Sequence, residues 1–210
     1  LIAWSIEAAA ASGLFDRIVV STDDAEIADV ASANGAEAPF VRPAELSDDH
    51  AATVPVIAHA VEWVRSRGEA ATEICCIYAN PFVQAEDLQS ALRTLETGKW
   101  EYVFSATSFA APVRRAFEQT PAGGVRMIFP DTEEARSQDL PPALHDAGQF
   151  YWGLADAWVR REPIFTGRST VEILPRWRVQ DINTPEDWEL STAIFKASRS
   201  NSSGADRNPC

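Results

Sequence analysis

Apolar and polar positions repeat with two periods along the chain, and each period predicts a different kind of element. Apolar residues recur at helical spacing in four segments of the first half: residues 1–12, 25–34, 53–67 and 85–96. Short β-branched or aromatic runs, typical of buried strands, stand between them at residues 17–21, 73–78 and 102–106. Because strands and helices alternate, the sequence predicts an α/β fold with a parallel sheet that helices cover on both faces.

Capping signals support several of these helices. Gly13 follows the first segment where a helix C-cap belongs, and Asp24 precedes the second segment as an N-cap. Near the C-terminus, Thr184 suits an N-cap, Pro185 the first helical position and Asp187 the third. These three residues predict the start of the last helix.

The second half of the chain has a looser pattern. Over residues 113–142 the pattern loosens, Gly123 and Gly124 predict a turn, and residues 131–139 form a polar run. Further strands are predicted at residues 150–153, 171–174 and 178–182. We expect one domain over residues 1–197 and a disordered tail over residues 198–210. Since the chain opens inside an apolar helical segment, we also expect it to be a fragment that lacks its true start.

Composition narrows the function classes. Eighteen Lys and Arg against 31 Asp and Glu give a net charge of −13, which argues against general nucleic-acid binding. No apolar run approaches the 18 or more residues of a membrane span, so we expect no membrane partner. Two of the three cysteines, Cys75 and Cys76, are adjacent in an apolar strand, and the set matches neither a disulfide framework nor a spaced zinc site. A reducing, cytoplasmic setting fits this cysteine content best.

Polar residues follow three of the predicted strands, at residues 21–24, 78–81 and 105–108. The carboxyl ends of parallel strands are where open α/β sheets bind their ligands. For any one of these stretches an ordinary turn or helix cap is the favoured interpretation. The presence of three such polar stretches favours a ligand-binding site but does not identify the ligand.

Asp181 and Asn183 form a more specific pair. Residues two apart on a strand face the same side, so their oxygens could together face a hard cation. The alternative is a strand-end turn ahead of the Thr184 cap, and spacing alone leaves both interpretations open. The chain has no Gly-x-Ser-x-Gly, His-Glu-x-x-His or Walker motif, which removes the simplest hydrolase and P-loop hypotheses.

Several stretches closely resemble the CMP-sugar synthetase (cytidylyltransferase) family: residues 1–6, 15–24 and 42–46. Four others resemble the branch of that family that acts on pseudaminic acid: residues 103–109, 136–140, 145–153 and 178–182. The resemblance runs, with short gaps, from Leu1 to about Trp188. It implies a Rossmann-like three-layer fold of the nucleotide-diphospho-sugar transferase type, with a mixed, mostly parallel sheet that here lacks its first strand.

The resemblance also implies an activity. CMP would pass from CTP to a nonulosonic acid, foremost pseudaminic acid, with release of pyrophosphate and with Mg²⁺ as cofactor, to supply surface-glycan or flagellin glycosylation. Sialic or legionaminic acid is the alternative substrate, and a non-catalytic nucleotide-sugar-binding relative is the alternative class. The family also suggests a homodimer.

Site residues carry over by motif position. Arg42 and Thr53 resemble nucleotide-binding residues of the family. Asp181 resembles its first metal-binding aspartate, with a catalytic role. Tyr78, Gln149 and Tyr151 fall where the family binds the acceptor sugar, and Arg136 resembles a catalytic residue suited to hold the sugar carboxylate.

Three departures from the family pattern stand out. The basic, glycine-rich loop that cradles the CTP phosphates is absent from this sequence, so we expect the 210-residue chain alone to be inactive. Asn183 stands where the family has its second metal aspartate, which would lower metal affinity because an amide brings no charge. The stretch from Tyr78 to Phe82 is one residue short of the family's loop.

Overall fold

A four-stranded mixed sheet lies at the centre of the fold. The computed structural model describes residues 1–48 and 50–202. The sheet consists of β1 (Glu73–Ile77), β5 (Leu144–Leu154), β2 (Tyr102–Ser108) and β6 (Ser169–Ile173), in that spatial order. β5 is antiparallel to both of its neighbours, and β2 is parallel to β6. β1, β2 and β6 therefore share one direction and β5 runs against them, which confirms a mixed sheet. The all-parallel sheet predicted from the alternation of strands and helices is wrong, because β5 returns from residues 109–143 and inserts between β1 and β2.

The described residues form six α-helices around the sheet: α1 (Ile2–Ser12), α2 (Ala25–Ala33), α3 (Thr53–Ser66), α4 (Ala85–Leu95), α5 (Ala155–Val159) and α6 (Pro185–Ser202). The predicted caps are confirmed, because Gly13 ends α1 in the left-handed conformation and Asp24 accepts two backbone N–H groups at the start of α2. α6 continues to Ser202, five residues past the predicted end at Ala197, and residues 203–210 of the predicted tail lie outside the described part of the chain.

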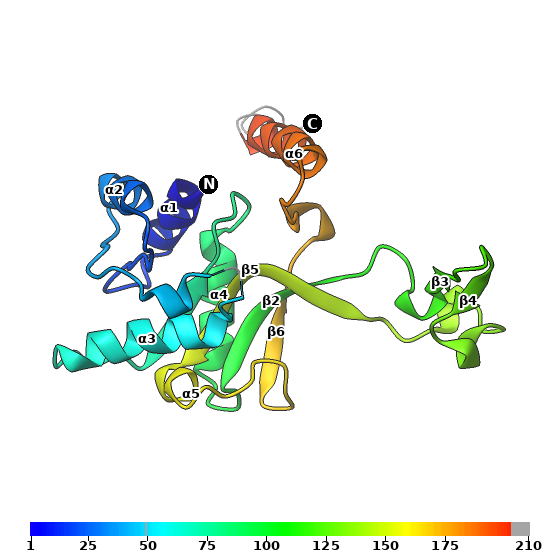
Figure 1. The fold of residues 1–210 in the computed structure, drawn as a ribbon, viewed down its shortest axis with the longest axis horizontal. Coiled ribbons are helices and arrows are strands. Elements are labelled where there is room, and N and C mark those ends of the chain that lie inside the picture. The colour runs from blue at the N-terminus through cyan, green and yellow to red at the C-terminus, as the bar shows by residue number, and fades with distance from the viewer. Residues whose placement is uncertain (49, 203–210) are drawn as a thin grey trace, which may run out of the picture.

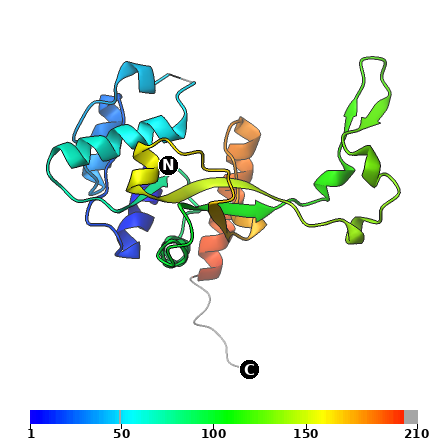
Figure 2. The same cartoon turned by 90° about the horizontal axis from the view of Figure 1, so that it is seen from below.

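Helices cover both faces of the sheet, as predicted. On one face, Tyr102 and Phe104 of β2 pack with Val61 of α3 and Trp158 of α5. On the other face, Val103 of β2 belongs to a second cluster built by α1, α4 and β5. Successive residues of a strand point to opposite faces, so β2 serves both clusters at once. The result is a three-layer domain (Figures 1 and 2).

Two predicted strands are wrong. Within residues 17–21 only Val19 forms a bridge, an isolated parallel one with Glu37, and Thr22 just beyond forms another with Val41, so the segment is not a strand of the sheet. Arg17 reinforces this bridge region, since its guanidinium donates to both Glu37 and Glu69 at 2.5–2.9 Å. Residues 178–182 are not a strand either: a 3₁₀ turn, η5 (Arg176–Arg178), is followed by irregular backbone. In both cases the β-branched pattern is present, but the described residues provide no continuous pairing partner.

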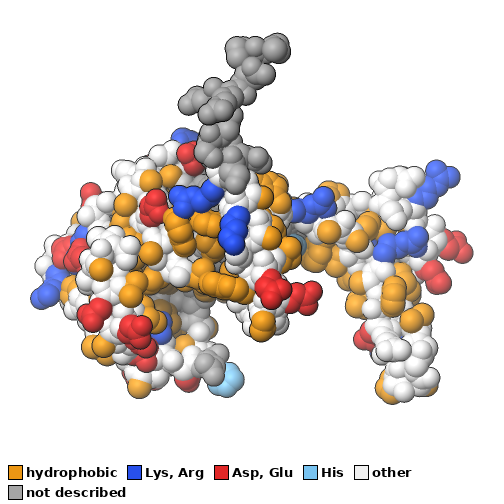
Figure 3. All heavy atoms as spheres, turned by 90° about the horizontal axis from the view of Figure 1, so that it is seen from above, with side chains coloured by type: hydrophobic (Ala, Val, Ile, Leu, Met, Phe, Trp, Pro, Cys, Tyr) orange, Lys and Arg blue, Asp and Glu red, His pale blue; other side chains and the backbone are white. Residues whose placement is uncertain are grey.

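Residues 109–143 leave the sheet as an arm. The described arm carries three 3₁₀ turns, at Val113–Arg115, Pro130–Thr132 and Ser137–Asp139. Its two-stranded hairpin, β3 (Phe117–Gln119) and β4 (Val125–Met127), turns at the predicted Gly123–Gly124 position. β5 leads back from the arm into the centre of the sheet (Figure 1). In the space-filling view the arm stands apart from the body and exposes hydrophobic side chains (Figure 3).

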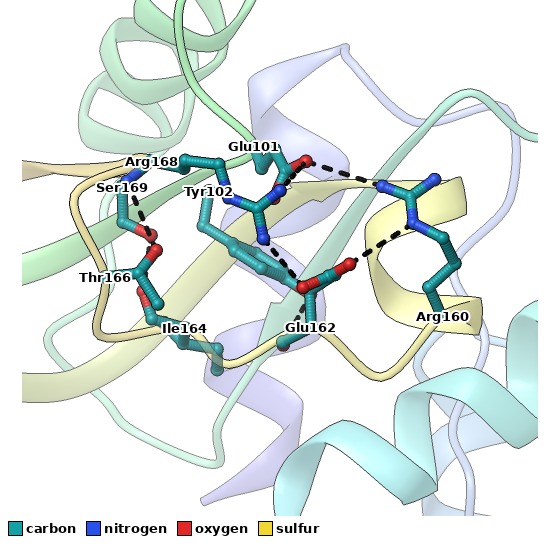
Figure 4. Close-up of polar contacts among 8 residues, drawn as sticks. All are labelled: Glu101, Tyr102, Arg160, Glu162, Ile164, Thr166, Arg168 and Ser169. Carbon is teal, nitrogen blue, oxygen red and sulfur yellow. Dashed lines mark hydrogen bonds and ion pairs between the residues drawn. The ribbon is translucent and has the colours of Figure 1, made fainter.

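Ionic contacts tie together the opposite end of the sheet, where β2 and β6 begin. Arg168 donates to Glu101 at 3.0 Å and to Glu162 at 2.7 Å, and Arg160 contacts the same two carboxylates at 3.4 Å (Figure 4). The Tyr102 hydroxyl donates to the Glu162 carbonyl at 3.1 Å. Both arginines are about half exposed, so this network contributes little stability. The network lies at the end of the sheet opposite the candidate site.

Candidate active site

Three of the expected site residues meet where β1 ends. The Tyr78 backbone N–H donates to the Gln149 carbonyl at 2.9 Å, which extends the pairing of β1 and β5 by one residue. The Tyr78 hydroxyl is hydrogen-bonded to the Thr53 hydroxyl in the first turn of α3. The Tyr78 ring lies 5.7 Å from the Tyr151 ring, centroid to centroid. Thr53, Tyr78 and Tyr151 thus form one cluster, in which Tyr78 contacts both of the other residues.

Both tyrosine hydroxyls stay protonated near neutral pH. Burial raises the pKa of Tyr78 above its ordinary value of 10. Burial also raises the pKa of Tyr151, and the hydrogen bond from its hydroxyl to Asp146 raises it further. The Tyr151 proton is already donated to Asp146, so its oxygen remains free to accept a hydrogen bond. These side chains can therefore orient a ligand but are unsuited to act as bases at pH 7.

A bulge in β5 turns Gln149 inward. Phe104 pairs with Tyr151 and Ala106 with Asp146, so Ser105 alone faces the intervening residues of β5. The Ser105 hydroxyl accepts the backbone N–H groups of Gln149 and Phe150, each at 3.1 Å. Bulges of this kind re-aim side chains and are common beside active sites.

Gln149 is fully buried at this bulge, and only half of its amide is satisfied. Its Nε2 donates to the Arg178 carbonyl at 2.6 Å. Its Oε1 is buried without a hydrogen-bond partner in the described part of the chain. An unpaired buried acceptor costs free energy, so it marks a position where a ligand donor would be favourable.

The loop that carries Asp181 and Asn183 lies next to Gln149. Besides the Gln149 contact to Arg178, the Asn80 side chain donates to the Gln180 carbonyl at 3.2 Å. Asp181 and Asn183 are both exposed, and the Asn183 amide donates to the Asp181 carboxylate at 2.8 Å. The predicted proximity of these two side chains is confirmed, although they sit on a loop and not on a strand.

Asp187 does not join this pair. Its carboxylate accepts hydrogen bonds from the Thr184 hydroxyl and from the backbone N–H groups of Thr184 and Asn183, at 2.7–3.2 Å. Those bonds, with the Thr184 hydroxyl foremost, lower the pKa of Asp187. The Thr184 hydroxyl in turn accepts the Asp187 N–H at 3.2 Å, which confirms the predicted helix start.

Arg42 occupies a separate position beside the bridge region. Its backbone N–H donates to the Thr22 carbonyl at 2.9 Å, and its guanidinium contacts Ser47 at 3.1 Å and Asp23 at 3.4 Å. A pocket of about 280 Å³ lies alongside, lined by residues 22–25, Ala28 and 38–41. Among the described contacts none joins Arg42 directly to Thr53.

Arg136 lies on the arm. Its carbonyl accepts the Asp139 N–H at 3.0 Å in a 3₁₀ turn, and within the described residues no side-chain hydrogen bond or ion pair links it to the cluster around Tyr78. The structure thus brings together Thr53, Tyr78, Gln149 and Tyr151 with the loop of Asp181 and Asn183, and it leaves Arg136 apart.

Sequence reasoning missed three residues of the site: Asn80, Ser105 and Asp146. Each lies inside a stretch that resembles the family or follows a predicted strand. The partners of Asn80 and Ser105 are distant in sequence, whereas Asp146 contacts Tyr151 only five residues away. A signal was available for the bulge, since Gly148 adopts φ 61° and a glycine inside a strand pattern indicates a bulge. The adjacent cysteines are not part of the site; burial raises the pKa of Cys76 to about 12.

In the part of the chain that the structure describes, no helix is both long and apolar enough to cross a bilayer. A three-layer fold with polar side chains gathered where β1 ends defines an α/β protein whose candidate ligand site lies at the edge of its sheet. The family model described as "Cytidylyltransferase" matches residues 1–198. The chain belongs to the cytidylyltransferase family and is a nucleotidyltransferase.

Individual relatives agree with this family. "Pseudaminic acid cytidylyltransferase" of Campylobacter jejuni is 41% identical over 197 residues, which cover 93% of this chain and 85% of that protein. "Pseudaminic acid cytidylyltransferase and UDP-2,4-diacetamido-2,4,6-trideoxy-beta-L-altropyranose hydrolase" of Helicobacter pylori is 35% identical, covering 92% of this chain and 37% of that protein. A solved CMP:2-keto-3-deoxy-manno-octonic acid synthetase, complexed with CTP, superimposes with a TM-score of 0.61 over 95% of this chain and 88% of the other, at 14% identity. That likeness shows the fold.

Proposed function

We propose that this protein transfers CMP from CTP to pseudaminic acid and releases pyrophosphate, providing an activated sugar for surface-glycan or flagellin glycosylation. The observation that carries the proposal is the meeting of Thr53, Tyr78, Gln149 and Tyr151 with the Asp181 loop at one end of the sheet. The identity to two relatives named for pseudaminic acid supports the choice of sugar.

The reaction needs positioning and charge neutralisation. The anomeric hydroxyl oxygen of the sugar would attack the α-phosphorus of CTP and lose its proton to water. The bond from that phosphorus to the bridging oxygen would break as pyrophosphate leaves. Arg42 and Thr53 would hold the nucleotide. Tyr78, Gln149 and Tyr151 would orient the sugar through neutral hydrogen bonds, of which the free Oε1 of Gln149 is one acceptor.

The residues of the Asp181 loop fit a magnesium ion. A carboxylate and an amide oxygen are hard ligands, and the two side chains are adjacent and open to solvent. Mg²⁺ is usually held by one or two protein carboxylates, waters and substrate phosphates, so a two-residue protein site suits it. When bound there, the ion would neutralise phosphate charge. Asp181 would supply the protein's charge, and Asn183 a neutral ligand.

We further propose that the enzyme works as a homodimer in the cytoplasm, where CTP is available. The arm carries exposed apolar side chains, led by Val125 at 71% and Phe117 at 62% exposure, and such a surface favours burial against a partner. A second copy seated on the arm would also place Arg136 at an interface, where a bidentate contact to the sugar carboxylate becomes feasible.

One observation favours a second candidate, a non-catalytic nucleotide-sugar-binding protein. Asn183 brings no charge to the proposed metal site, and a binding module has less need of the ion. Catalytic turnover distinguishes the enzyme from the binding protein. The acid that is turned over distinguishes pseudaminic acid from the alternative sugars.

Pyrophosphate release by the full-length gene product tests the proposal, with CTP, Mg²⁺ and either pseudaminic, legionaminic or sialic acid. Release with pseudaminic acid supports the proposed reaction and sugar. Release with only one of the other acids would replace the sugar. A folded protein that binds CTP but releases no pyrophosphate with any of them would establish the binding module instead.

A further inference from the structure

A buried ion pair fixes the backbone just ahead of the Asp181 loop. Asp87 lies in the first turn of α4, and Arg178 is the last residue of η5. Arg178 Nη2 donates to Asp87 Oδ1 at 3.0 Å, and Nη1 donates to Oδ2. The Arg178 side chain is 8% exposed and the Asp87 side chain 14%. The two residues are 91 positions apart in sequence, so the pair joins α4 to a segment that follows β6 far along the chain.

A pair of this kind is sensitive to the loss of either member. The fork of a guanidinium meets a carboxylate in one plane, and two parallel hydrogen bonds restrict direction as well as distance. Removing one charge leaves the other buried and uncompensated, whereas replacing both with apolar groups is often neutral for stability. Arg178 is thus fixed to α4 in both position and orientation.

Two further contacts extend this anchor toward the site. The Arg178 carbonyl accepts Gln149 Nε2 at 2.6 Å, and the Gln180 carbonyl accepts Asn80 Nδ2 at 3.2 Å. Beyond the loop, Asp187 accepts the backbone N–H groups of Asn183 and Thr184. Asp181 and Asn183 therefore lie on a short span between two fixed points, and the Asp87–Arg178 pair holds the first of these points.

We propose that Asp87 and Arg178 are positioning residues that aim the Asp181 carboxylate and the Asn183 amide at the metal. The inference rests on the proposed function, since it assigns a task to residues outside the proposed metal site itself. Neither Asp87 nor Arg178 would touch the ion. Their effect would come through the direction in which the backbone leaves residue 180.

Mn²⁺ binding by the full-length protein, followed as loss of the free-ion electron paramagnetic resonance signal, tests the proposal without requiring turnover. Asp87→Asn keeps the shape of the side chain and removes its charge, and we expect Mn²⁺ binding to weaken about tenfold, the scale of lost outer-shell support. The matched control is Leu95→Ala at the other end of α4. Leu95 is fully buried in the core, so its truncation destabilises the fold and should leave Mn²⁺ affinity unchanged.

A double variant separates positioning from folding. Asp87→Leu with Arg178→Met replaces the pair with apolar groups, so the protein should keep its thermal midpoint while Mn²⁺ binding weakens by a similar factor. A folded double variant with wild-type Mn²⁺ affinity would overturn the positioning role and leave the proposed function intact. A wild-type protein that takes up no Mn²⁺ would instead overturn the proposed metal site, and the positioning role with it.

Discussion

Asn183→Asp gives a sharp test of the metal site, because it adds one charge at a ligand position. The Asn183 amide lies 2.8 Å from the Asp181 carboxylate, and both groups are exposed, so water sets the local dielectric constant. Two unit charges 4 Å apart in water interact by about 1 kcal/mol, and a dication doubles this to about 2 kcal/mol. At about 1.4 kcal/mol for each factor of ten, metal affinity should rise roughly thirtyfold.

The assay is a Mn²⁺ titration of wild-type and Asn183→Asp protein in the same buffer. Gln119→Glu, which adds the same charge on the exposed arm, serves as the control and should bind Mn²⁺ like the wild type. Without metal, the variant should be slightly less stable, since two carboxylates then face each other where a hydrogen bond was. Unchanged or weaker binding by Asn183→Asp would show that this side chain does not face the ion.

Two further predictions concern the fold around the site. Ser105→Ala leaves the buried N–H groups of Gln149 and Phe150 without their acceptor, so the free energy of unfolding should fall by about 2–4 kcal/mol in a denaturant titration. The control, Ser66→Ala at an exposed position, should change it little. Equal effects of the two substitutions would refute the role of Ser105 as acceptor. The hydrogen bonds from Arg17 hold the pKa of Glu37 below its ordinary value of 4.5, so Glu37 stabilises the fold above that pH and loses its contribution as pH falls through the lowered pKa. Glu37→Gln should therefore have a lower thermal midpoint than wild type at pH 7, and the difference should shrink as the pH is lowered below 4.5. A difference independent of pH would contradict this.

The helices could be predicted from the sequence because their signals are local. Helical spacing of apolar residues and caps at Gly13 and Asp24 are complete within one element, so α1 and α2 form where expected. A strand forms only when another segment pairs with it, and the local pattern does not indicate which segment that is. Residues 17–21 and 178–182 have strand-like composition, yet the described residues give the first only an isolated bridge and leave the second unpaired.

The roles of the candidate site residues stay predictions, and the sequence did not indicate how these residues assemble. Tyr78, Gln149 and Tyr151 could be selected by resemblance, and the structure places them together. The contacts that hold them come from residues distant in sequence, such as Ser105 under Gln149 and Asp87 under Arg178. Spacing indicated that Asp181 and Asn183 share a side, and they do so by a direct hydrogen bond on a loop.

Asp181→Asn tests the central claim most directly, in a comparison with the wild-type full-length protein under CTP, Mg²⁺ and pseudaminic acid. Asparagine keeps the size of the side chain and removes the one carboxylate that the proposed metal site contains. We predict pyrophosphate release by the wild type and a loss of at least about a hundredfold in the variant, the scale seen when a single electrostatic contact to the reacting groups is removed. Release at the wild-type rate by the Asp181→Asn protein would contradict a CMP-transfer site at this end of the sheet.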